Sequence, residues 1–96
     1  MKGRLIRHTK VREDDGNIIE VKLWEVNPSA DKPHGYKYSL VYVAGGERVI
    51  CYDNGEGKGD HRHYRKSVER YEFKTMRRLI DDFSRDVEKY KTGENL

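Results

Sequence analysis

The chain has little of what marks secreted or membrane proteins. Its one cysteine, Cys51, cannot form an internal disulfide, which excludes a disulfide scaffold. No apolar run approaches the roughly 20 residues of a membrane-spanning helix, and the N-terminal stretch lacks the apolar segment of a secretory signal. We therefore expect a cytoplasmic protein with no membrane partner.

Apolar residues are also scarce, at 34% of the 96 residues against 39% charged. This supply suffices for one core, so we expect a single domain over residues 1–96. Charge is unevenly distributed. Residues 1–57 are neutral overall, residues 58–78 carry eight basic and three acidic side chains, and residues 79–96 have a net charge of −2. A basic segment of this kind indicates an anionic partner, either nucleic acid or an acidic protein surface.

Alternating polarity predicts β-strands in the first three quarters of the chain. Turn residues at Asp14–Asn17 and Ala44–Glu47 predict two hairpins, and both prolines lie in a loop, Asn27–Gly35, between them. The expected strands cover Gly3–Glu13, Ile18–Val26, Tyr36–Val43, Arg48–Asp53 and Val68–Phe73.

The pattern changes to a helical period near the C-terminus. Apolar side chains recur at the spacing of one helix face from Met76 to Tyr90, with Thr75 as the N-cap and Gly93 at the end. The predicted fold class is therefore α+β: an antiparallel sheet of four to five strands with one C-terminal amphipathic helix packed on it.

The segment Tyr52–Tyr64 concentrates the side chains that can carry chemistry. It contains histidines, basic residues, tyrosines and aspartates around three closely spaced glycines. On an extended backbone, His61 and His63 point to one side and Arg62 to the other. We expect the imidazole and guanidinium groups of this tip to surround one exposed pocket.

Three functions fit this segment, beside the interpretation that its side chains only cap turns and form ion pairs. The first is metal-independent RNA cleavage, because an imidazole can both accept and return a proton near neutral pH. Asp53 and Asp60 would orient the histidines, and no cofactor is needed. The candidate catalytic residues are His61, His63, Lys58, Arg62 and Tyr64.

The second function is metal-dependent hydrolysis, with His61 and His63 joined by Asp60 or Asp53 as ligands. The third is RNA or other nucleic-acid binding without cleavage, in which basic side chains neutralise phosphates and tyrosines stack on bases. The candidate nucleic-acid-binding residues are Lys58, Arg62, Arg65, Lys66 and Tyr52.

The same segment carries a family resemblance. The strings Tyr36–Tyr42, Tyr52–Asn54, Gly57–Tyr64, Tyr71–Phe73 and Leu79–Val87 together resemble the TumE family of prokaryotic toxins. This resemblance implies the toxin of a toxin–antitoxin module, an intracellular prokaryotic setting and a small helix-turn-helix antitoxin of the TumA type as partner. It leaves open whether the chain forms a homodimer.

Overall fold

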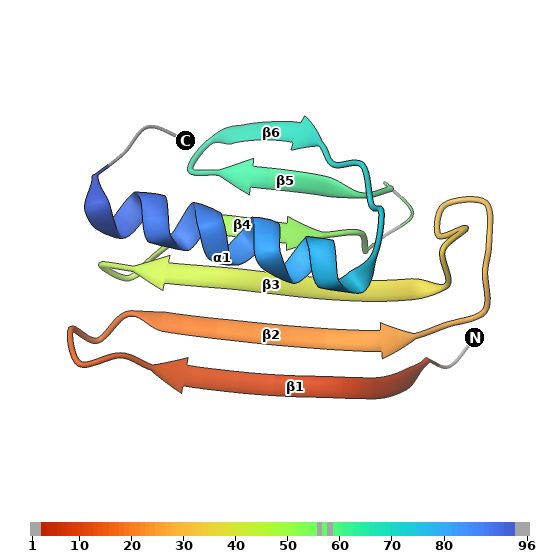
Figure 1. Cartoon of the computed structure of the whole chain (residues 1–96), viewed down its shortest axis with the longest axis horizontal. Helices are drawn as coiled ribbons and strands as arrows, with labels where there is room; N and C mark the ends of the chain where they lie inside the picture. Colours follow the sequence, from red (N-terminus) through yellow and green to blue (C-terminus); the bar gives the residue numbers. More distant parts are fainter. Residues whose placement is uncertain (1–2, 56, 58, 94–96) are drawn as a thin grey trace.

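The computed structural model describes residues 3–55, 57 and 59–93. It shows an antiparallel sheet with one helix across one face (Figure 1). The strands lie in the sheet in sequence order, so each connection joins neighbours. The elements are β1 (Arg4–Arg12), β2 (Ile18–Glu25), β3 (Tyr36–Ala44), β4 (Glu47–Asp53), β5 (His61–Tyr64), β6 (Ser67–Arg70) and α1 (Met76–Thr92).

The α+β class and the C-terminal helix are confirmed, but the predicted strand number is wrong, because the sheet has six strands. The additional strand is β5, whose four polar residues lack the alternation that reveals a strand. Pairing with β4 orders it, since Cys51 lies opposite His63 and Asp53 opposite His61. The strand expected at Val68–Phe73 is shorter, and it follows a turn in which Arg65 has a φ of 53°.

The core lies between α1 and the sheet. Leu79, Phe83 and Val87 face the sheet from successive turns of α1. The sheet contributes apolar and tyrosine side chains from alternate positions of its central strands: Val21, Leu23, Tyr38, Leu40, Tyr42, Ile50 and Tyr52. Burial of a large side chain stabilises a fold by about 1.5–3 kcal/mol, so this interface holds α1 on the sheet.

Both predicted ends of α1 are confirmed. The Thr75 hydroxyl accepts a hydrogen bond from the Arg78 amide at 3.0 Å, which satisfies one of the free amides of the first turn. Gly93 ends the helix with a φ of 77°, a conformation that glycine adopts without strain. No described helix combines the length and the hydropathy that a membrane span requires.

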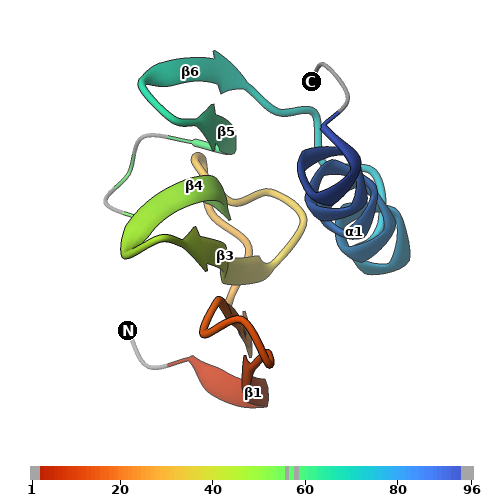
Figure 2. The same cartoon turned by 90° about the vertical axis from the view of Figure 1, so that its left-hand side faces the viewer.

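The opposite face of the sheet, which we call the uncovered face, has no helix over it (Figure 2). The strand register assigns side chains to it in transverse rows. One row runs through Lys22, Ser39, Asp53, His61 and Arg70. The neighbouring row runs through Glu20, Val41, Cys51, His63 and Val68. The predicted histidine segment is thereby incorporated into the sheet.

Candidate functional site

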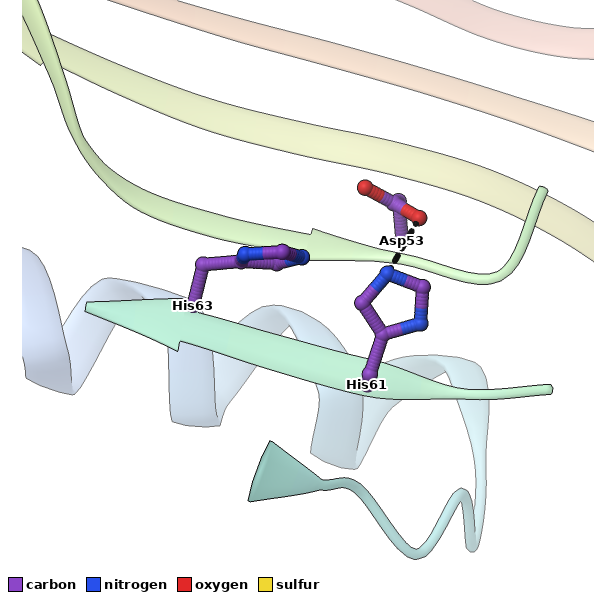
Figure 3. A group of neighbouring side chains, drawn as sticks. All are labelled: Asp53, His61 and His63. Atoms are coloured by element: carbon purple, nitrogen blue, oxygen red, sulfur yellow. Dashed lines mark ion pairs between the residues drawn. The ribbon is translucent and has the colours of Figure 1, made fainter. Parts of the chain in front are cut away.

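Asp53, His61 and His63 meet on the uncovered face, and we call them the histidine cluster (Figure 3). Asp53 ends β4, and the two histidines lie two residues apart on β5. Because side chains alternate along a strand, both imidazoles point to the same side, as predicted. Their ring centroids are 4.8 Å apart, so two proton-transfer groups lie within reach of one small ligand.

Two contacts orient the His61 ring. Its Nδ1 lies 3.0 Å from the carbonyl oxygen of Gly59. Its Nε2 lies 3.0 Å from Oδ1 of Asp53. Both partners are hydrogen-bond acceptors, so both contacts are satisfied together when the ring carries a proton on each nitrogen. In that form His61 is an acid held by a carboxylate.

Two shallow pockets adjoin the cluster, and His63 borders both. The larger, of about 430 Å³, is lined by Asp60, His61, His63, Val68, Glu69 and Arg70. The smaller, of about 220 Å³, is lined by Arg48, Cys51, Asp53, His63 and Arg65. A phosphate at His63 would therefore have arginine side chains on both sides.

Arg48 and Arg70 are the basic residues that sequence reasoning missed at this site. Both are exposed. The strand register places both on the uncovered face, Arg70 directly opposite His61. Arg48 belongs to a predicted strand, but strict alternation would place it with Ile50 on the helix side, and only the register shift between Tyr42 and Val43 turns it to the uncovered face. Arg70 required the pairing of β5 with β6, which the sequence does not reveal.

Cys51 adjoins the cluster but is no nucleophile. Burial, together with the nearby Asp53 carboxylate, raises the pKa of the Cys51 thiol to about 12. Its Sγ lies 3.4 Å from Oδ2 of Asp53, to which the thiol donates a weak hydrogen bond. Because the thiolate is the reactive form, this residue is inert near neutral pH.

Arg62 lies on the helix side of the sheet, away from the histidines. Its Nε donates to Oδ2 of Asp86 at 2.6 Å, and the Tyr52 hydroxyl donates to the same oxygen at 2.5 Å. The Arg62 side chain is 14% exposed and the Tyr52 residue 2%. Burial opposes the shift, but the Asp86 carboxylate raises the pKa of Arg62. The expected single pocket of imidazole and guanidinium groups therefore does not form around Arg62.

Tyr64 and Lys66 also lie apart from the cluster, whereas Arg65 lines the smaller pocket beside it. Tyr64 pairs with Ile50 and packs on the core. The Arg65 guanidinium lies over the Tyr64 and Tyr90 rings, at 5.7 and 5.6 Å from their centroids. Lys66 is exposed in the turn between β5 and β6. Lys58, another predicted phosphate ligand, lies outside the described residues.

Asp60 contacts a histidine, His34, that was not selected as a candidate from the sequence. Its Oδ2 accepts from the Tyr38 hydroxyl at 2.7 Å and lies 2.9 Å from Nε2 of His34. The His34 ring packs against Phe73, with 4.0 Å between centroids. His34 Nδ1 accepts from the Tyr36 amide, so its Nε2 carries the proton that Asp60 binds. These contacts tie the β2–β3 loop to the start of β5.

The histidine cluster also has the donor set of a metal site. One ligand atom from each of its three residues lies within 4.8 Å of the others. Two imidazoles and a carboxylate suit zinc and other divalent transition metals. The Gly59 carbonyl would hold the Nδ1 proton of His61 and leave Nε2 for the ion, the arrangement usual for metal-bound histidines. The residues of the histidine cluster therefore fit a divalent ion as well as the metal-free ion pair between Asp53 and His61.

Comparison with known proteins identifies the family. Neither the curated proteins nor the solved structures compared with this chain include a match. The family model described as "Toxin TumE" matches residues 2–91, nearly the whole chain and every described strand. The match includes the histidine cluster and the helix that packs behind it. The chain therefore belongs to the TumE family of toxins, and this membership implies an antitoxin partner.

Proposed function

We propose that this toxin acts on RNA as an endoribonuclease, with the histidine cluster as its active site. The observation that carries the proposal is the pair of adjacent imidazoles on an uncovered sheet face, one of them held by Asp53 and the Gly59 carbonyl. Cleavage next to a 2′-hydroxyl needs one group that accepts a proton and another that donates one. Adjacent imidazoles supply both.

In the proposed reaction each ring transfers one proton. His63 accepts the proton of the 2′-hydroxyl as its oxygen attacks phosphorus. The bond from phosphorus to the 5′-oxygen breaks, and His61 gives that oxygen its proton. The products are a 2′,3′-cyclic phosphate and a 5′-hydroxyl. Arg48 and Arg70, which line the two adjoining pockets, stabilise the charge on the phosphoryl oxygens.

The test is cleavage of a labelled RNA in EDTA, with identification of the product ends. We expect His61→Ala and His63→Ala each to slow cleavage by about 10²–10⁴-fold. His8→Ala is the matched control. His8 is on β1 and lies on the uncovered face like the cluster, but its ring pairs with Glu20. Binding of RNA without any cut product would contradict cleavage and favour a toxin that acts by binding alone.

The metal-binding donor set supports a second candidate, a metal-dependent hydrolase. It predicts that zinc or manganese copurifies with the protein and that EDTA abolishes cleavage until the ion is restored. Asp53→Asn separates the two routes. It removes an ionic ligand and would release the ion, whereas in the metal-free route it leaves both histidines able to transfer protons.

We also propose that the antitoxin partner is a helix-turn-helix protein. Family membership supports an antitoxin, and the basic composition of residues 58–78 suits an acidic surface on that partner. Co-expression with the product of the neighbouring reading frame, followed by affinity purification, tests the pairing. Recovery of the toxin alone from that co-expression would contradict it.

A further inference from the structure

The uncovered face is strongly basic beyond the histidine cluster. Among the described strand residues, the register places Lys10, Arg12, Lys22, Lys37, Arg48 and Arg70 on this face, against Glu20 and Asp53. Glu20 is already paired, since its Oε2 lies 2.8 Å from Nε2 of His8. The excess positive charge therefore extends over the whole width of the sheet.

Trp24 gives this face an aromatic surface. It is the chain's only tryptophan, lies on β2 opposite Lys37 and is partly exposed. The Lys37 Nζ lies 5.1 Å from the centre of the indole. Leu5, the Trp24 partner on β1, is 54% exposed. A flat ring beside an exposed cation is an arrangement by which proteins hold an unpaired base and its phosphate.

The aromatic surface is continuous with the histidine cluster. Lys22 precedes Trp24 by two residues on β2, and its transverse row leads through Ser39 to Asp53 and His61. Neighbouring strands are about 4.8 Å apart, so Trp24 lies about 15 Å from His61. Single-strand sites of several nucleotides span such distances. In the described part of the chain, α1 lies on the other side of the sheet from this route (Figure 2).

We propose that the uncovered face binds single-stranded RNA, with one base stacked on Trp24 and the adjoining phosphates held by Lys22 and Lys37. The inference rests on the proposed action on RNA and names its substrate class. In a duplex the bases are stacked on one another, so none is free to stack on the Trp24 indole. A single strand running across β2, β3 and β4 places a later phosphate at the histidine cluster.

The experiment uses the complete protein and a 2′-O-methyl oligonucleotide of about ten mixed-sequence nucleotides. This probe lacks the 2′-hydroxyl, so binding is measured without cleavage. We expect it to quench the Trp24 fluorescence, and anisotropy of a labelled copy gives the affinity of each variant. Trp24→Ala should weaken binding about tenfold or more, and Trp24→Phe should weaken it less because a ring remains.

Charge variants separate the two faces. Lys22→Ala/Lys37→Ala should weaken binding and reduce the slope of log K against log salt by about 1.4. The matched control is Arg7→Ala/Arg77→Ala, which removes equal charge from exposed residues on the helix side of β1 and on α1. This control should retain at least half of the affinity, and circular dichroism verifies that each variant is folded.

Three results would overturn the inference: equal affinity for the matching duplex, unchanged affinity in folded Trp24→Ala, or equal losses in the two double variants. Preferential binding of an acidic protein, with no fluorescence change on adding the oligonucleotide, would also overturn it. These failures are distinct from failure of the proposed function. If the protein binds the probe but does not cleave natural RNA, only the proposed nuclease activity is contradicted. If Trp24→Ala leaves cleavage unaffected, only the proposed binding site is contradicted.

Discussion

Asp86→Ala tests whether Arg62 belongs to the fold or to the RNA site. The substitution leaves a guanidinium group that is 14% exposed without its partner at 2.6 Å, and it leaves the Tyr52 hydroxyl without its acceptor. Loss of one partner of a buried ion pair costs about 3–5 kcal/mol. Glu69, 3.6 Å from Arg62 and 67% exposed, compensates weakly, so we expect about 3 kcal/mol.

The loss is measured by urea unfolding, followed through Trp24 fluorescence and circular dichroism. For a domain of this size, about 3 kcal/mol lowers the Tm by about 12–24 °C. Replacement of the entire polar group, as Tyr52→Phe/Arg62→Met/Asp86→Leu, should recover most of the stability because no buried polar atom is left unpaired. This triple variant also tests function, since it should retain RNA cleavage if Arg62 binds no phosphate.

Two results would refute this reasoning. A loss below about 1 kcal/mol in Asp86→Ala would mean that Arg62 is solvated and free to leave the helix side. A triple variant that is stable but no longer cleaves RNA would show that Arg62 is needed for cleavage and support its assignment as a phosphate ligand. Arg70→Ala is the control on the other face. It should leave stability unchanged within about 0.5 kcal/mol while weakening cleavage, because Arg70 is exposed and lines the pocket at His61.

Three further predictions concern pH, thiol reactivity and the helix start. Burial opposes the shift, but hydrogen bonds from Tyr71 and Arg78 lower the pKa of Asp82. The contribution of Asp82 to the free energy of unfolding is complete above the pKa of the unfolded carboxyl, near 3.9, and is lost as the pH falls below it. Asp82→Asn should therefore lose less unfolding free energy than the wild type between about pH 5 and 2. An equal loss in the two proteins would contradict this. Since burial raises the pKa of Cys51, iodoacetamide at about pH 8 should modify it at least tenfold more slowly in the folded than in the urea-unfolded chain, and equal rates would show that the thiol is accessible. Thr75→Ala should cost about 1 kcal/mol in urea unfolding through loss of the bond to the Arg78 amide, and no loss would show that this cap is dispensable.

The two faces of the sheet have different roles, one in stability and the other in the proposed function. On the helix side, tyrosine hydroxyls donate to aspartates one turn apart on α1: Tyr71 to Asp82 and Tyr52 to Asp86. These bonds, one from β4 and one from the segment that follows β6, hold α1 on the sheet. The uncovered face carries the histidine cluster and a row of basic residues that includes Lys37, Arg48 and Arg70. Substitutions on the helix side should therefore affect stability more than function, and substitutions on the uncovered face should affect function more than stability.

Local patterns were enough to predict most of the fold. The period of 3.6 residues from Met76, the Thr75 cap and Gly93 are all near-neighbour features, and they set the extent of α1 correctly. Both hairpin turns and the proline-containing loop depend on the conformations of a few consecutive residues. Alternation along the strand likewise determined that His61 and His63 share a face.

Long-range pairing decided the rest, because it depends on which residues come to lie opposite one another. β5 is a strand because β4 orders it, and its register places His61 between Asp53 on β4 and Arg70 on β6. Packing of α1 drew Arg62 to Asp86, although Arg62 lies between the two histidines in sequence. Composition identified the basic segment, but only the sheet and helix together determined which of its charges face a ligand and which hold the fold.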